Sequence, residues 1–202
     1  MGFRKEKKFR VTFSDYYKFK NQLHQQGMNI IFEPRQITSV YFDTINLNMF
    51  HDSEEGILPR KKVRIRWYNN NLKFRLENKI SSIEGRFKVT SKIENNILEN
   101  ELYMKNRLDE QYGHIQPILK VSYKRSYFMI NDMRITFDRD ITYQNLRHAN
   151  KRKYYDPERV IEIKTPAVYP DDFVEKIIPY STARFSKYTR GLLLSLGCLS
   201  EV

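Results

Sequence analysis

Several segments of the chain alternate ionic and apolar side chains with the two-residue period of a β-strand. Residues 62–67 read KVRIRW, so Arg64 and Arg66 share one strand face while Trp67 lies on the other with two aliphatic residues. Like charges on neighbouring strands repel each other and cost stability. Their repetition indicates a surface that holds a polyanion. The same alternation occurs in residues 4–10 (RKEKKFR), 74–79 (FRLENK) and 160–164 (VIEIK).

A sheet with one ionic and one apolar face has two physical solutions. An open sheet packs its apolar face on helices and exposes its charges to water. A closed barrel turns the ionic face inward around a wet channel and packs helices on its outside. Both have the same sequence periodicity, so the alternation alone leaves the choice open.

Composition supports an anionic partner and a folded, sheet-rich protein. The 202 residues carry a formal net charge of +12 and give a pI of about 9.6. Such a charge favours phosphates, nucleic acid or an acidic membrane surface as partner. Aromatic residues make up 14% of the chain, which favours strands. The length predicts one domain over residues 1–202.

The sequence predicts a soluble, cytoplasmic protein. Cys198 is the only cysteine, so an intrachain disulfide is impossible and a reducing compartment is natural. Its leucine-rich surroundings predict a buried packing role. The N-terminus is basic and lacks the apolar region of a signal peptide. No run of apolar residues is long enough to span a membrane.

Turn and cap residues divide the chain into a mostly antiparallel α+β domain. Ser14 is the expected N-cap of a first helix that Gly27 terminates. Hairpin turns are predicted at 69–71 and 131–132, and a basic exposed loop at 147–156. Strands are expected at 3–12, 37–43, 61–68, 72–80, 84–92, 118–130, 133–138 and 159–165, and further helices near 47–50, 94–113, 171–178 and 187–196.

The ordered motifs resemble a known enzyme superfamily over nearly the whole chain. They are residues 4–9 (R-x-E-x-K-F), 39–44 (SVYFDT), 62–68 (KVRIRWY), 77–79 (ExK), 121–128 (VSYKRSYF), 134–138 (RITxD), 160–164 (VIEIK) and 185–188 (FSKY). This order resembles the triphosphate tunnel metalloenzymes (CYTH-like superfamily). Within them it is most similar to the polyphosphate polymerase domain of the vacuolar transporter chaperone (VTC) family. The resemblance implies an α+β fold: a closed antiparallel eight-stranded β-barrel tunnel with helices packed outside.

The resemblance also implies the residues of the site. Phosphate oxygens would be held by Lys8, Arg64, Arg66, Lys79, Arg125, Arg134, Lys164 and Lys187. Arg64, Arg66, Lys79 and Glu162 would carry catalysis. Glu162 would be the principal ligand of Mn²⁺ or Mg²⁺, assisted by Glu6 and Glu77. Arg125 shares its strand face with Tyr123 and Tyr127, which equally fit a packed aromatic face.

These residue types suit phosphoryl transfer, which needs charge neutralisation and positioning more than a protein nucleophile. The planar fork of Arg matches phosphate, and hard divalent metals take carboxylate oxygens. Hydrolytic relatives commonly begin with Glu-x-Glu-x-Lys, whereas this chain has Arg4-x-Glu6-x-Lys8. The exchange removes an acid and adds a cation, which favours the polymerase branch.

The leading hypothesis is a metal-dependent polyphosphate polymerase-like phosphotransferase that moves the terminal phosphoryl of a nucleoside triphosphate onto a polyphosphate chain. The alternatives are an inorganic triphosphatase or nucleotide hydrolase of the same fold, and a non-catalytic module that binds polyphosphate or RNA. Nucleic acid is disfavoured, because base stacking needs aromatics beside the phosphate contacts. Here the aromatics mostly alternate with the charges, and Tyr68 is the main exception. The histidines lack metal-ligand spacing, and no Gly-rich phosphate loop is present.

Overall fold

The structure is a computed structural model that describes residues 4–69, 71–93, 105–148, 152–170, 172–178 and 180–199. For residues 4, 71, 72, 176 and 177 it describes the backbone alone. The strands are β1 (Arg4–Val11), β2 (Asn29–Asp43), β3 (Arg60–Tyr68), β4 (Asn71–Ser82), β5 (Gly85–Lys92), β6 (Arg107–Asp109), β7 (Gly113–Ile130), β8 (Met133–Asn145), β9 (Lys153–Asp156) and β10 (Arg159–Pro166). The helices are α1 (Phe13–Gln25), α2 (Asn48–Glu55), α4 (Phe173–Ile177) and α5 (Lys187–Ser195).

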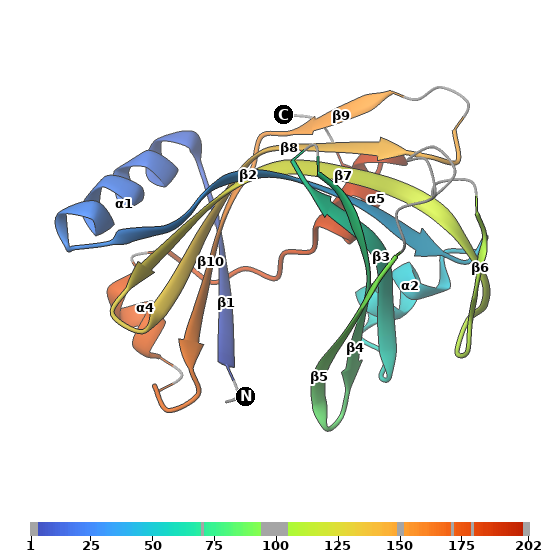
Figure 1. Cartoon of the computed structure of the whole chain (residues 1–202), viewed down its shortest axis with the longest axis horizontal. Helices are drawn as coiled ribbons and strands as arrows, with labels where there is room; N and C mark the ends of the chain where they lie inside the picture. Colours follow the sequence, from blue (N-terminus) through green and yellow to red (C-terminus); the bar gives the residue numbers. More distant parts are fainter. Residues whose placement is uncertain are drawn as a thin grey trace.

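The strands form one curled antiparallel sheet that arches over a concave face (Figure 1). Eight strands follow one another in the order β1-β10-β8-β7-β2-β3-β4-β5, while β6 pairs with β7 and β9 with β8. The long strands β2 and β7 cross the top of the arch. One arm consists of β1, β10 and the adjoining end of β8, and the other of β3, β4 and β5.

The expected closed barrel is wrong, because the sheet is an open half-barrel. Its strand order ends at β1 on one side and at β5 on the other, and no described residues pair these two edges. Both edge strands are rich in charge: β1 reads RKEKKFRV and β5 reads GRFKVTSK. Charged side chains, Lys above all, discourage pairing at a sheet edge. The alternating pattern encodes which face is buried but not how far the sheet curls.

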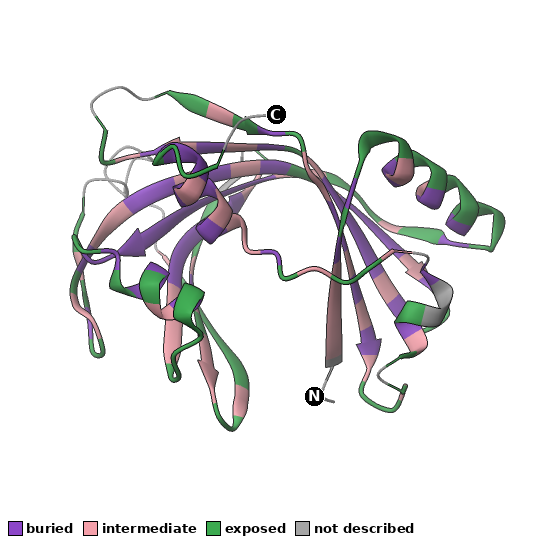
Figure 2. Cartoon of the chain, turned by 180° about the vertical axis from the view of Figure 1, so that it is seen from behind, coloured by how far each residue is buried: buried purple, intermediate pink, exposed green. Residues whose placement is uncertain are grey.

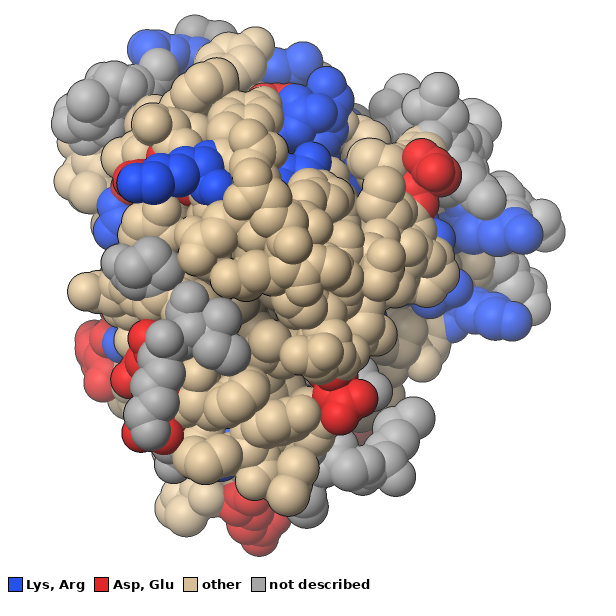
Figure 3. All heavy atoms as spheres, turned by 90° about the vertical axis from the view of Figure 1, so that its left-hand side faces the viewer, with Lys and Arg blue, Asp and Glu red and all other residues tan. Residues whose placement is uncertain are grey.

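Two helices cover the outside of the β1–β10 arm. Thr12 caps α1 by accepting a hydrogen bond from the backbone N–H of Asp15 at 3.1 Å, so the predicted cap at Ser14 is wrong by two residues. Phe19 of α1 and Val174 of α4 are buried against the apolar face of the sheet. Seen from this side, residues other than Lys, Arg, Asp and Glu cover most of the outer surface (Figure 3).

The helices α2 and α5 pack together on the sheet near the other arm. Leu192 of α5 is fully buried with Leu119 of β7 and Tyr143 of β8. Gly191 permits this approach, since a Cβ there would lie 2.3 Å from the Tyr143 ring. A third cluster contains Trp67, which is buried with Phe74 as its place on the apolar face predicts.

The turns and connecting segments predicted from the sequence agree only in part with the structure. The two hairpins are confirmed by the antiparallel pairing of β3 with β4 and of β7 with β8, although residue 70 of the first predicted turn lies outside the described chain. Asn69 and Asn131 adopt the left-handed backbone that asparagine tolerates. The helix expected at 94–113 is wrong at its end, which forms β6 and the start of β7, while residues 94–104 lie outside the described chain. The loop expected at 147–156 ends in β9, because its residues extend the sheet beside β8.

The expected burial of Cys198 is also wrong. The thiol is exposed, because the chain leaves α5 through Gly197 in a left-handed conformation. In the parts of the chain that the structure describes, no helix has the length and apolar character needed to cross a membrane.

Candidate functional site

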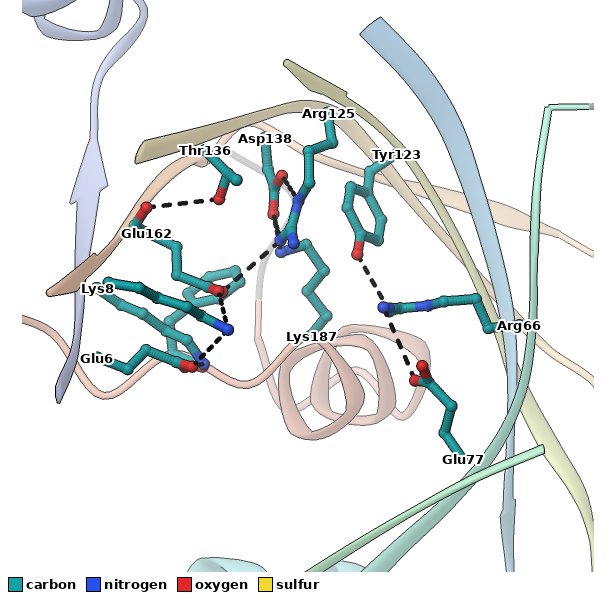
Figure 4. A network of polar contacts seen from close by, with 12 residues as sticks. Glu6, Lys8, Arg66, Glu77, Tyr123, Arg125, Thr136, Asp138, Glu162 and Lys187 are labelled. Carbon is teal, nitrogen blue, oxygen red and sulfur yellow. Dashed lines mark hydrogen bonds and ion pairs between the residues drawn. The ribbon is translucent and has the colours of Figure 1, made fainter. Parts of the chain in front are cut away.

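The concave face of the sheet forms a cavity of about 690 Å³, here called the groove. Each of the eight cations expected to hold phosphate lines it: Lys8, Arg64, Arg66, Lys79, Arg125, Arg134, Lys164 and Lys187. Glu6 and Glu162 line it as well, whereas Glu77 lies behind Arg64 and Arg66. Strand alternation therefore brings the ionic residues of β1, β3, β4, β7, β8 and β10 into one space (Figure 4).

On the β3 arm, Arg64 and Arg66 are buried and tightly held. The Arg64 Nε donates to Glu77 Oε2 at 2.7 Å, and its Nη1 donates to the Tyr41 hydroxyl at 2.9 Å. Burial alone raises the pKa of Glu77, but the two arginines lower it to about 2. The same carboxylate accepts a hydrogen bond from Lys88 of β5. Glu77 thus anchors cations, with both oxygens engaged.

Arg66 is oriented by neutral groups. Its Nε donates to Ser39 Oγ at 3.0 Å, and its Nη2 donates to the Tyr123 hydroxyl at 3.1 Å. The separation between Arg66 Nη1 and Glu77 Oε2 is 3.9 Å, at the limit of an ion pair. The positive charge of Arg66 is therefore incompletely compensated, and its planar group is fixed for bidentate contact with an oxyanion.

Two lysines on this arm sit in a strongly cationic environment. Repulsion by Arg64, followed by burial and Arg66, lowers the pKa of Lys79 to about 6, although its side chain reaches the water of the groove. Lys79 makes no ion pair with any described residue. Burial, followed by Lys8 and Arg60, lowers the pKa of Lys62 to about 8 against the opposing effect of Tyr41. An anion bound between these amines would relieve the repulsion.

On the opposite arm, two carboxylates share one lysine. Lys164 lies 3.1 Å from an oxygen of Glu6 on β1 and 3.1 Å from an oxygen of Glu162 on β10. Lys8 lies 3.2 Å from the other Glu6 oxygen. Burial raises the pKa of Glu162, but Arg125, Lys164 and Lys8 outweigh it and hold the pKa below its usual range. The pKa of Glu6 is lowered as well, since Lys8 and Lys164 prevail over burial and Glu162.

At the top of the groove, Arg125 makes a bidentate ion pair with Asp138 of β8, at 2.5 and 2.7 Å. Lys187 donates to the same carboxylate at 2.6 Å. Arg125 Nη2 also approaches Glu162 Oε2 at 3.7 Å. Arg125 lines the groove together with Tyr123, and the Arg125 guanidinium lies over the Tyr123 ring at 5.4 Å from its centre.

Arg134 retains unused hydrogen-bonding capacity. Its Nε is buried and lacks a hydrogen-bond partner among the described residues, while the side chain lines the groove. A buried donor without a partner costs free energy unless a ligand or water satisfies it. Together with Lys79 it marks the groove as a site for an anion.

The carboxylates fit a divalent metal only together with a ligand. Among the described residues, no group of three or more His, Cys, Asp and Glu could hold a metal. Glu6 and Glu162 are both ionised and lie near each other (Figure 4). Each of them pairs with Lys164 at 3.1 Å. Mg²⁺ is commonly bound by one or two carboxylates plus phosphate oxygens and water. These two glutamates could supply the protein's share of such a set.

Sequence reasoning missed several residues of the groove. They are Lys62, Arg86, Lys88 and Arg184. Lys62 was detectable, since it shares the strand face of Arg64 and Arg66. Asp138 was missed as well: it is buried where it pairs with the groove residues Arg125 and Lys187, and the second of these contacts joins residues 49 positions apart. Strand alternation cannot reveal such a contact.

A segment of residues 183–186, here called the strap, crosses one end of the groove from one arm to the other (Figure 2). The backbone N–H of Ala183 donates to the Lys8 carbonyl at 2.8 Å, and Lys8 Nζ donates to the Phe185 carbonyl at 3.3 Å. On the other arm, Lys62 Nζ donates to Ser186 Oγ at 3.0 Å. The strap is followed directly by Lys187, the first residue of α5, whose side chain lines the groove.

Comparison with solved structures identifies the same fold in other proteins. A candidate adenylate cyclase from Bacillus halodurans has a TM-score of 0.60 at 15% identity, covering 92% of this chain and 96% of its own. A candidate adenylyl cyclase from Hippeastrum, described as having a dominant triphosphatase activity, has a TM-score of 0.56 at 17% identity, with 95% of each chain covered. A protein from Pyrococcus horikoshii has a TM-score of 0.54 at 17% identity, covering 96% and 99%.

The search of curated proteins found no match. A family model described as the VTC domain matches residues 3–196, which include every strand, helix and groove residue named above. The chain therefore belongs to the VTC domain family.

Proposed function

We propose that this protein is a metal-dependent polyphosphate polymerase-like enzyme. It transfers the terminal phosphoryl of a nucleoside triphosphate to a polyphosphate chain bound in the groove. The observation that carries the proposal is the incompletely compensated cationic lining opposite a pair of ionised carboxylates. Lys79 and Arg66 face the space from one arm, and Glu6 and Glu162 border it on the other.

In this proposal the cations bind phosphate and the carboxylates bind the metal. Arg64, Arg66 and Lys79, with Lys8, Arg125, Arg134, Lys164 and Lys187 around them, would neutralise and align the phosphates. An oxygen of the acceptor chain attacks the terminal phosphorus, the new P–O bond forms, and the bond to the departing nucleoside diphosphate breaks. Glu162, with Glu6 beside it, would hold Mn²⁺ or Mg²⁺, which supplies charge neutralisation on phosphate oxygens when bound. Glu77, paired with Arg64, would act on the metal at most through water.

Hydrolysis of a triphosphate is the second candidate. It is favoured by the likeness in fold to the Hippeastrum protein with its described triphosphatase activity. Both reactions use the same phosphate contacts and differ only in whether water or a phosphate chain attacks. The polymerase is favoured by Arg4 on β1, which stands where hydrolytic members of the superfamily commonly have an acid.

A labelled assay separates the candidates. The purified protein is incubated with Mn²⁺ and a nucleoside triphosphate labelled at its terminal phosphorus. A polymerase yields long acid-precipitable polymer, a hydrolase yields orthophosphate alone, and a binding module yields neither. Arg64→Ala and Glu162→Gln should abolish turnover. Lys18→Ala, which removes an exposed cation from α1, is the matched control and should leave it intact.

RNA binding is tested by competition. Single-stranded RNA should displace bound polyphosphate poorly, because the rings beside the cations, such as Tyr41, Tyr123 and Tyr127, are buried and offer little exposed face to a run of successive bases. Equal affinity for RNA and polyphosphate would contradict the proposed substrate class.

A further inference from the structure

The groove-facing residues of β3 change character along the strand. Lys62, Arg64 and Arg66 are cations, and the next groove-lining residue is Tyr68. Lys62 contacts the strap, so Tyr68 lies at the end of β3 away from it. Two residues of strand rise place Tyr68 about 7 Å beyond Arg66. An aromatic ring thus follows the row of phosphate-binding cations at the groove mouth opposite the strap.

Tyr68 belongs to a cluster of rings around one guanidinium, here called the aromatic cluster. The Arg35 guanidinium lies 4.9 Å from the ring centre of Phe32, 5.5 Å from that of Tyr127 and 5.9 Å from that of Tyr68. Tyr127 also lines the groove, and Arg134 lies over it at 5.6 Å. The cluster therefore adjoins the phosphate-binding residues directly.

The backbone of β2 is irregular where it builds the cluster. In a regular strand, Phe32 and Arg35 would point to opposite faces, because they are an odd number of residues apart. Register shifts on both sides of Phe32 bring the two side chains together against Tyr127. Irregularities of this kind re-aim side chains and are frequent beside active sites.

Tyr127 forms the buried floor of the cluster, whereas its other members are accessible. Phe32 is 46% exposed, and Tyr68 and Arg35 are half-buried. Exposed aromatic and guanidinium planes beside a phosphate site are the groups on which nucleobases stack. The row of cations on β3 would hold the phosphates while the cluster receives the base.

We propose that the aromatic cluster is a nucleobase subsite, so that a nucleoside triphosphate enters the groove by the mouth opposite the strap with its base stacked on Tyr68 and Phe32. This inference rests on the proposed use of a nucleoside triphosphate. It adds the binding direction: the terminal phosphate points toward Lys62 and the strap. Because stacking depends on the flat ring that every base has, we expect the subsite to discriminate little between adenine and guanine.

The test compares ligands with and without a base in metal-free buffer, where metal-dependent turnover is not expected. Dissociation constants for ATP, tripolyphosphate and ribose 5-triphosphate are measured by calorimetry. Tyr68→Ala and Phe32→Ala should each weaken ATP binding about fivefold or more, as expected for loss of one stacking partner. Both should leave tripolyphosphate and ribose 5-triphosphate within about twofold of wild type. Tyr68→Phe keeps the ring and should bind ATP normally.

Phe87→Ala is the matched control, because Phe87 of β5 is an exposed ring that lines the groove on the same arm as Tyr68 but level with the other end of β3, through its pairing with Ile80 and the pairing of Ile80 with Lys61. Equal losses for ATP and tripolyphosphate in Tyr68→Ala would overturn the subsite, as would unchanged ATP binding or a loss confined to Phe87→Ala. In each of these cases the nucleobase subsite is wrong, but the proposed phosphate site is still supported as long as the wild-type protein binds tripolyphosphate. A wild-type protein that binds no tripolyphosphate would instead overturn the proposed function, and the subsite with it.

Discussion

Lys187, the first residue of α5, donates a hydrogen bond to Asp138 on β8, with Nζ and Oδ2 2.6 Å apart. The contact links the helix that follows the strap to the top of the arch. Asp138 is fully buried and also holds Arg125 through two hydrogen bonds. One carboxylate therefore fixes two cations of the groove and balances part of their charge.

We expect Asp138→Asn to destabilise the fold by about 3 kcal/mol, because removal of one partner leaves buried cations uncompensated. Denaturant unfolding at neutral pH measures the change. Burial raises the pKa of Asp138, but Arg125 and Lys187 lower it below its usual value. The stabilisation is then complete above about pH 3.9, the usual value of an unfolded Asp, and is lost as the pH falls through the lower folded value. A difference between wild type and variant that persists undiminished at the most acidic accessible pH would contradict this origin.

Binding of tripolyphosphate should take up protons near neutral pH. The pKa values of Lys79, about 6, and Lys62, about 8, are low because of neighbouring cations and burial, and a bound anion raises them. Affinity should therefore fall as the pH rises from 6 to 9. Calorimetry in buffers of different ionisation enthalpy counts the protons. Lys79→Met should reduce the uptake by up to about one proton, and Lys18→Met, on the outer surface, should not change it.

Removal of the Glu162 carboxylate should have opposite effects with and without metal. Glu162 pairs with Lys164 at 3.1 Å and approaches Arg125 at 3.7 Å. In Glu162→Gln these cations are freed for phosphate, so metal-free tripolyphosphate should bind more tightly than to wild type. The tightening of binding by added Mn²⁺ should be lost.

Titrations with and without Mn²⁺ measure both effects. Glu175→Gln is the control, because Glu175 pairs with Lys7 on the outer surface. Weaker metal-free binding in Glu162→Gln would show that the carboxylate positions the cations more than it competes with the anion.

Gly191→Ala should loosen α5 from the sheet. The added Cβ would lie 2.3 Å from the Tyr143 ring, which is buried and held by a hydrogen bond from its hydroxyl to Asp156 at 2.7 Å. Overpacking of this kind costs about 1–3 kcal/mol. Thermal unfolding should report the loss, and tripolyphosphate affinity should fall as Lys187 shifts. The replacement Gln22→Ala, at an exposed position of α1, serves as a comparison that leaves α5 and its contacts unchanged. If Gly191→Ala is as stable as wild type, the Tyr143 ring can move away from the added Cβ without a measurable loss of stability, and the prediction is wrong.

Much of the site could be predicted because strand alternation is local. Arg64 and Arg66 share a face whatever the sheet does next, and their neighbours Ile65 and Trp67 are buried as that alternation requires. The groove cations on β1, β3, β4, β8 and β10 followed from the same pattern and from family resemblance together. Their placement around one cavity is a property of the sheet's curvature.

The remainder depends on contacts between distant residues or on weak local signals. Closure of the sheet is decided at two charged edges far apart in the chain, and periodicity contains no information about it. The stretch before β7 has a polar composition that suits a helix, yet Arg107–Asp109 pairs with β7. The strap and the Asp138–Lys187 contact bring the end of the chain back to its middle, which no local pattern reports.

The open edges of the half-barrel bear on how the long product of the proposed polymerase would be handled. In a closed tube a growing chain must be threaded through both ends, and its free end must find the exit each time. Between two arms whose described residues share no ladder across β1 and β5, a chain could be laid in and lifted out along its length, except where the strap crosses. Release then depends on how firmly individual phosphates are held along the trough, so polymer length would respond to salt and pH more than to the width of an opening.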